Sequence, residues 1–185
     1  MIGSYVALLR GINVGGRNKL PMRDLAEIFA DAGCIDITTY IQSGNVVFRA
    51  PDDLAARIPG LISDSIAERL DLRVPVVTRS AAELAEIVFG NPYLGIERDF
   101  TKLHVAFLAD HPTEAALNAL DPDRSPGDAY QVRGGEIYLH LPNGAAGSKL
   151  SNAYFDAKLG TTSTARNWKT VLKLHDLLGA LPDSR

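Results

Sequence analysis

Glycines and basic side chains are interleaved in residues 8–22, whose sequence is LLRGINVGGRNKLPM. Gly11, Gly15 and Gly16 permit positive φ angles and let backbone N–H groups approach another group closely. The same segment carries cations and amides and no acid: Arg10, Asn13, Arg17, Asn18 and Lys19. A strand followed by a glycine loop and a helix, with bases and no acid, is the chemistry of an anion pocket. The phosphate-loop patterns GxxxxGK[ST] and GxGxxG are both absent, so the segment indicates a binding site without naming a reaction.

A second group of basic residues lies towards the other end of the chain. Residues 143–175 contain a single acid, Asp156. Their cations are Lys149, Lys158, Arg166, Lys169 and Lys173. The net charge of the whole chain is −3, which argues against broad coating of nucleic acid. Two remote basic segments in an acidic chain would make sense if they meet at one site.

Three predicted helices each begin beside a lysine. The three lysines are Lys19, Lys149 and Lys169. A helix N-terminus has partial positive charge and favours acids, so a lysine there is unfavourable. A bound anion would reconcile the lysines with the helix ends. The alternative is that each lysine points to solvent at a small cost.

Hydrophobic periodicity and turn residues predict the elements that must position these groups. Strands are expected at residues 5–10, 38–42, 45–49, 74–78, 102–109, 130–133, 136–141 and 161–165. Helices are expected at residues 21–32, 51–70 with a bend at 59–60, 80–89, 113–120, 148–159 and 168–178. The order β-α-β-β-α-β occurs twice, which predicts an α+β fold of two tandem ferredoxin-like halves. The expected bounds are 1–90 for the first half, 91–101 for a linker, and 102–185 for the second half with its C-terminal helix.

Size and composition fit a protein of the cytoplasm. A chain of 185 residues, 46% of them hydrophobic, can bury one good core or two small joined cores. The chain has a single cysteine, Cys34, so a disulfide within the chain is ruled out. We expect Cys34 to lie in a core. No apolar run approaches the roughly 20 residues of a membrane span, and no secretory signal is visible. We therefore expect a cytoplasmic protein that does not bind membranes.

Four segments together resemble a known family. They are LLRGINVGGRNKLPM, TYIQSGNVVF at residues 39–48, SKL at 148–150 and TARNWKTVLKL at 164–174. The chain is similar over essentially its whole length to the bacterial family called domain of unknown function 1697. The resemblance implies two similar α+β halves and supplies no activity. The motif positions that it transfers are Arg10, Gly11, Asn13, Gly15, Gly16, Asn18, Lys19, Gln42, Ser43, Gly44, Asn45, Ser148, Lys149, Arg166, Asn167 and Trp168.

The leading hypothesis is a pocket for an anionic ligand at the interface of the two halves. The favoured ligand is a phosphate-bearing metabolite or a nucleotide. The expected ligand-binding residues are Arg10, Asn13, Gly15, Gly16, Lys19, Gln42, Asn45, Lys149 and Arg166. The planar fork of an arginine suits phosphate or carboxylate. No metal ligand pattern and no cofactor motif is visible, and the motif segments hold neither a histidine nor paired carboxylates. Whether the protein is an enzyme stays open.

Two alternatives belong to other functional classes. The first is a nucleic-acid or RNA-end binding module, which is possible but not favoured. Tyr5 and Phe48 are the only aromatic candidates for base stacking on the first and third strands, and both are expected in the core. The second alternative is a purely structural polar network among the motif residues. Ser148 and Asn167 would then serve as helix N-caps.

Overall fold

The structure of the protein is a computed structural model that describes residues 1–182. Contacts divide it into two compact units. Unit 1 comprises Met1–Glu86 and the described residues from Leu174 onward, and unit 2 comprises Ile87–Lys173. Helix α4 (Ala81–Phe89) and helix α7 (Trp168–Gly179) each run across the boundary in the chain. The residues of the predicted linker belong to unit 2, and the predicted domain bounds stay a prediction.

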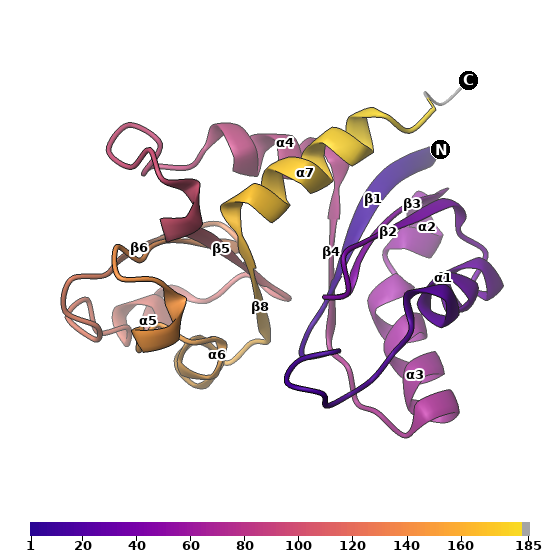
Figure 1. Cartoon of the computed structure of the whole chain (residues 1–185), viewed down its shortest axis with the longest axis horizontal. Coiled ribbons are helices and arrows are strands. Elements are labelled where there is room, and N and C mark those ends of the chain that lie inside the picture. The colour runs from indigo at the N-terminus through magenta and orange to yellow at the C-terminus, as the bar shows by residue number, and fades with distance from the viewer. Residues whose placement is uncertain (183–185) are drawn as a thin grey trace. The chain divides into compact units, whose positions relative to one another are not determined.

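A four-stranded antiparallel sheet forms the base of unit 1 (Figure 1). Its strands are β1 (Ile2–Leu9), β2 (Ile35–Tyr40), β3 (Asn45–Pro51) and β4 (Val76–Ser80). Their order across the sheet is β2-β3-β1-β4, with β1 paired to both β3 and β4. β1 and β3 are buried because their apolar runs lie in the middle of the sheet.

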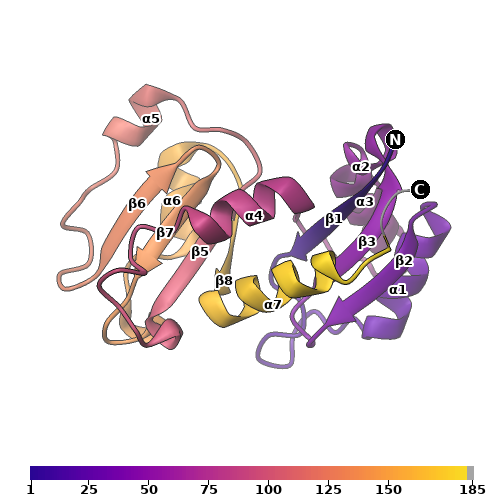
Figure 2. The same ribbon diagram turned by 90° about the horizontal axis from the view of Figure 1, so that it is seen from above.

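Three helices cover one face of this sheet, as the two views in Figures 1 and 2 agree. They are α1 (Met22–Asp31), α2 (Asp52–Ala55) and α3 (Ile58–Leu70). The core between helices and sheet includes Ala7, Leu25, Phe29, Val46, Phe48, Ile58 and Ile62. The single helix predicted over residues 51–70 is wrong, because the chain leaves helical structure between α2 and α3. Pro59 does not bend α3, since it occupies the first turn, where no N–H is needed.

Unit 2 repeats the topology of unit 1. Its strands are β5 (Leu103–Leu108), β6 (Ala129–Arg133), β7 (Glu136–His140) and β8 (Ser163–Asn167). They are ordered β6-β7-β5-β8, again with antiparallel pairs throughout. In both units the first and third strands are neighbours, which confirms an α+β fold of two tandem ferredoxin-like halves.

Short helices complete unit 2. They are η1 (Phe100–Lys102), α5 (Glu114–Asn118), η2 (Ala145–Gly147) and α6 (Asn152–Leu159). The second core joins the sheet to α6 through Ala106, Ile137, Leu139, Phe155 and Leu159, with residues of α5 packed against it. Among residues 1–182, no helix combines the length and the apolar character that crossing a lipid bilayer requires.

Side chains cap the starts of α4 and α6, although α6 begins later than predicted. The Ser80 hydroxyl and backbone N–H both donate to the Glu83 carboxylate, at 2.8 and 2.7 Å, in a capping box at the start of α4. The predicted start of α6 at Ser148 is wrong. α6 starts at Asn152, and the Oγ of Ser151 caps it by accepting from the Tyr154 N–H at 3.2 Å.

Candidate functional site

The predicted segments of unit 1 gather at one end of its sheet. β1 ends at Leu9, which pairs with Val76 at the start of β4. Asn45 begins β3 and pairs with Leu8 near the end of β1. The glycine loop after β1, the turn between β2 and β3, and the segment before β4 therefore lie together. We call this the loop end of unit 1, made of residues 10–21, 41–44 and 71–75.

The glycine loop has an unusual backbone. Five of its residues take positive φ angles: Gly11 (71°), Asn13 (55°), Gly15 (57°), Gly16 (75°) and Asn18 (50°). The Arg17 N–H donates to the Val14 carbonyl at 3.0 Å and closes a tight turn over Gly15 and Gly16. Two consecutive positive φ angles are what a type I′ turn requires. The glycines are thus explained in part by the turn itself.

Asparagine side chains hold the loop in place. The Asn13 amide donates to the carbonyls of Leu20, at 2.9 Å, and Gln42, at 2.8 Å. Its oxygen accepts from the Leu20 N–H at 2.9 Å. The Asn18 amide donates to the Gly11 carbonyl, also at 2.9 Å. Asn13 therefore joins the glycine loop to the turn between β2 and β3.

Gly44 is required at its position for two reasons. Its φ of +74° lies in the left-handed region. A Cβ there would come within 2.7 Å of the Leu9 Cβ and 2.8 Å of the Ile12 Cδ1. Ile12 is buried, so it anchors the start of the loop against this glycine.

The remainder of the turn combines a buried amide with a strained backbone. Asn45 is fully buried, and its amide donates to the Tyr40 carbonyl at 3.1 Å and the Ser43 Oγ at 2.9 Å. Ile41 has a φ of +49°, which is an outlier for a β-branched residue. Such strain clusters at binding sites and persists only where the surrounding structure enforces it. The Gln42 side chain is exposed beside it.

The tip of the glycine loop is open. A Cβ on Gly15 or Gly16 would have no other atom within 4 Å. Val14 is 64% exposed, and Arg17 and Lys19 are exposed too. Packing within the chain therefore does not account for the small residues at the tip, whereas access to its backbone would.

In unit 2, Arg166 is buried rather than presented at the surface. Its Nη1 donates to the Thr164 Oγ1 at 2.8 Å and to the Ala165 carbonyl at 2.9 Å. Burial lowers the pKa of the guanidinium to about 10, so it stays charged at neutral pH. The predicted ligand role of Arg166 stays a prediction.

The residues after Arg166 have structural tasks. The Asn167 Oδ1 accepts from the Lys169 N–H at 2.9 Å, which confirms Asn167 as the cap of α7. Its amide donates to the Thr101 carbonyl at 3.2 Å. Trp168 opens α7 and has no exposed surface.

Of the three lysines predicted at helix starts, Lys169 alone lies within a first helical turn. Lys19 precedes the first residue of α1 by three positions, and Lys149 does the same for α6. The helix-dipole argument for an anion therefore weakens at both. Hydrogen bonds from Thr101 lower the pKa of Asp99, and the charge of Lys169 contributes to the same shift. An acid of unit 2 thus partners Lys169.

The aromatic and cysteine predictions are confirmed. Phe48 is fully buried and stacks on Tyr5 at a ring distance of 5.7 Å. The Tyr5 hydroxyl donates to Asp52 at 2.8 Å, so neither ring is free for base stacking. Cys34 lies in the core, and burial raises the pKa of its thiol to about 11.

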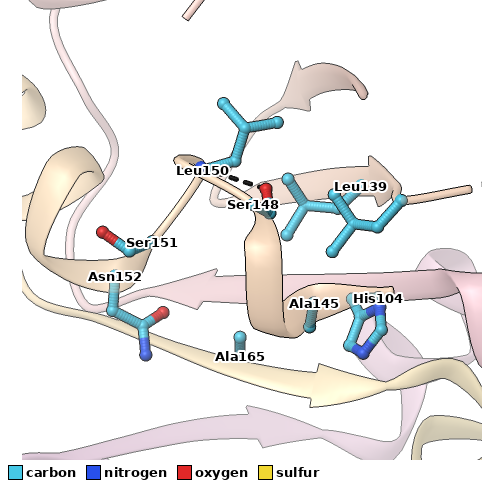
Figure 3. Close-up of a pocket in the computed structure, with 9 residues that line it drawn as sticks. His104, Leu139, Ala145, Ser148, Leu150, Ser151, Asn152 and Ala165 are labelled. Carbon is cyan, nitrogen blue, oxygen red and sulfur yellow. Dashed lines mark hydrogen bonds between the residues drawn. The ribbon is translucent and has the colours of Figure 1, made fainter. Parts of the chain in front are cut away.

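A hollow in unit 2 was not predicted from the sequence (Figure 3). Its volume is about 260 Å³, and its lining includes His104, Leu139, Leu141, Ser148, Leu150 and Ser151. His104 lies outside the motif segments, and the sequence offered one signal for it: a single polar residue in the apolar run LHVAFL of β5.

Comparison with known proteins supports the fold and the family. The chain resembles a solved structure described as that of the conserved bacterial protein SP0830 from Streptococcus pneumoniae, with a TM-score of 0.71 and 22% identity. The match covers 96% of this chain and 99% of that one, and it bears on the fold alone. No curated protein matches the sequence. The family described as "Protein of unknown function (DUF1697)" matches residues 2–138, and the chain belongs to that family.

Proposed function

We propose that the loop end of unit 1 binds a phosphate-bearing small molecule, such as a nucleotide or a sugar phosphate. The observation that carries the proposal is the exposed turn over Gly15 and Gly16, which is held in place by Asn13 yet touches nothing at its tip. Side chains fix this backbone at the cost of several left-handed residues.

Charge supports an anion at this end. Its segments carry four cations and one acid: Arg10, Arg17, Lys19, Arg73 and Asp71. The opposite end of the same sheet carries the acids Asp36, Asp52, Asp53 and Glu83 beside Arg49 and Arg79. An excess of cations over acids creates a positive potential that attracts anions.

The backbone supplies the second part of the proposed site. Successive N–H groups in left-handed and turn conformations form concave nests that bind phosphate oxygens. In the proposed complex, N–H groups around Gly16 contact the phosphate, and Lys19 and Arg17 neutralise its charge. Arg10 is half-buried at the base of the loop and lies closest to the sheet. Asn13 acts by holding the loop, since its amide is already engaged.

Isothermal titration with inorganic phosphate, ATP and glucose 6-phosphate tests the proposal. The double variant Arg17→Gln/Lys19→Gln should weaken binding by about 2- to 30-fold, because each exposed charge contributes roughly 0.2–1 kcal/mol. The matched control is Lys158→Gln/Lys173→Gln, which removes two lysines from α6 and α7. The control should bind as the wild type does. Equal losses in both double variants, or no binding of any of the three compounds, would reject the site.

A short single-stranded RNA in the same titration tests the nucleic-acid alternative. RNA binding should weaken steeply with salt, with a slope of about −0.7 per phosphate contact, whereas one bound phosphate gives a shallow dependence. Lys149→Gln and Arg166→Lys extend the titration to the predicted residues of unit 2. If neither variant changes affinity, the sequence-based prediction that those two residues bind the ligand is wrong.

A further inference from the structure

The hollow in unit 2 is lined by residues that the proposed phosphate site does not use. It lies beside the start of β5, where η2 and the start of α6 pass over the sheet (Figure 3). All of its lining residues belong to unit 2. Its volume of about 260 Å³ compares with roughly 150 Å³ for a cavity that admits benzene. One substituted six-membered ring would therefore fit.

One hydroxyl group offers a hydrogen to this hollow. The Ser148 Oγ accepts from the Leu150 N–H at 3.1 Å, shown as the dashed line in Figure 3. The Ser151 Oγ accepts from the Tyr154 N–H at 3.2 Å and points away from the side chains of Leu139 and His104. Within residues 1–182 the Ser148 hydroxyl donates to no protein acceptor. With its oxygen engaged by a backbone N–H group, this hydroxyl is placed to donate.

His104 adds a neutral ring to the lining of the hollow. Its Nδ1 is buried and has no hydrogen-bond partner in the described part of the chain. Burial lowers the pKa of the imidazole, so the ring is neutral near pH 7. Because Nδ1 has almost no accessible surface, a molecule in the hollow would contact the ring and not this atom.

The walls of the hollow exclude charge. Leucine side chains at 139, 141 and 150 and the methyl groups of Ala145 and Ala165 form them. No acid and no lysine or arginine lines the hollow, and the side chain of Lys149 is exposed outside it. A charged ligand would lose its hydration here without gaining a counter-charge.

We propose that this hollow binds a small uncharged molecule with an apolar ring and a carbonyl oxygen, which accepts a hydrogen bond from Ser148. The apolar ring contacts the leucines and the ring of His104. This site is separate from the phosphate site in residues, unit and ligand charge.

Two-dimensional amide NMR of the full chain tests the proposal with defined probes. Benzamide and cyclohexanone carry the carbonyl, ethylbenzene has only the apolar body, and benzoate has the charge. Benzamide or cyclohexanone should shift the amide signals of Leu150, Ser151 and Asn152 in a saturable manner. Ethylbenzene should bind about 2- to 12-fold more weakly, the equivalent of one net hydrogen bond. Benzoate should also bind more weakly, because its charge loses hydration without gaining a counter-charge. If neither carbonyl probe binds, or if benzoate binds equally well, the proposal is wrong.

Two neighbouring alanines provide a matched pair of variants. Ala145 lines the hollow and Ala146 does not, and both are exposed in η2, so neither change threatens folding. Ala145→Leu should abolish saturable binding of benzamide, whereas Ala146→Leu should leave it unchanged. Equal binding in both variants would place the probe elsewhere and overturn the site. Because every probe is uncharged or a carboxylate, failure here leaves the phosphate titration unaffected.

Discussion

The glycine loop of unit 1 and the Arg166–Trp168 segment of unit 2 both carry family motif residues, yet they differ in how far these residues are exposed. In unit 1 the motif forms an exposed turn whose tip touches nothing. In unit 2, Arg166 and Trp168 are buried, and Asn167 caps a helix. The loop is held by side chains that bond to backbone, whereas the second segment is held by burial.

A motif residue can be needed for packing of the fold or for binding, and the difference in exposure distinguishes these two cases. A buried tryptophan is accounted for by packing, and its loss should unfold the protein. Exposed glycines and lysines are not accounted for by packing, and their loss should leave the protein folded. Stability measurements at matched positions can therefore show which motif residues the fold requires, and which remain for binding.

The largest effect is expected for Trp168→Ala. Removing a fully buried indole should destabilise the protein by about 3–5 kcal/mol, through lost burial and the cavity left behind. Urea unfolding followed by circular dichroism measures the change. Trp168→Phe should cost about half as much, because the indole Nε1 has no hydrogen-bond partner in residues 1–182 and none is lost. Equal stability of Trp168→Ala and the wild type would contradict the assignment of this segment to the core.

The next prediction compares two glycines of unit 1 with nearly the same φ. Gly44→Ala should cost about 2–4 kcal/mol, because it adds a clash with the Leu9 Cβ to the backbone strain. Gly16→Ala has the strain without the clash and should cost about 1 kcal/mol. Thermal unfolding of the two variants, monitored by the single tryptophan, gives the comparison. Indistinguishable melting temperatures would show that the loop tip is packed as tightly as the turn.

Much of the fold could be predicted from the sequence, because its signals are local. The Ser43-Gly44 and Gly134-Gly135 pairs mark the two hairpins, and the box at Ser80 marks the start of α4. The start of α6 could not be chosen in the same way, since Ser148 and Ser151 are both suitable caps. The Ser148 hydroxyl instead bonds the N–H two residues later, a local turn that competes with the helix.

The candidate site was less predictable because its contacts join distant parts of the chain. Asn13 donates to the carbonyl of Gln42, 29 residues away, and the prediction of Asn13 as a ligand-binding residue could not contain that information. The left-handed conformation of Ile41 is likewise enforced by neighbours and not by its own propensity. His104 became visible only when the fold placed it beside Ser148 in one hollow.

A third prediction tests whether Asn13 holds the loop. Asn13→Gly removes three hydrogen bonds while keeping the positive φ accessible, and it should cost about 1–2 kcal/mol. Asn13→Ala should cost about 1 kcal/mol more, because alanine is unfavourable at a φ of 55°. In both variants the Leu20 amide, which donates to Asn13, should exchange its hydrogen faster. Unchanged exchange at Leu20 would mean that the loop is held by other contacts.

The smallest effect concerns pH and extends the comparison to the hollow of unit 2. Burial lowers the pKa of His104 below its ordinary value of 6.5, so the unfolded chain binds this proton more readily than the folded chain. Stability is therefore expected to fall as pH drops below 6.5, and to level off once pH passes the lowered pKa of the folded state. His104→Phe removes the titration and the unpartnered Nδ1, so its melting temperature should be less sensitive to acid between pH 7.5 and 5.5. The other three histidines are present in both proteins and cancel in the difference. Parallel curves for the two proteins would mean that His104 is as well solvated in the folded chain as in the unfolded one.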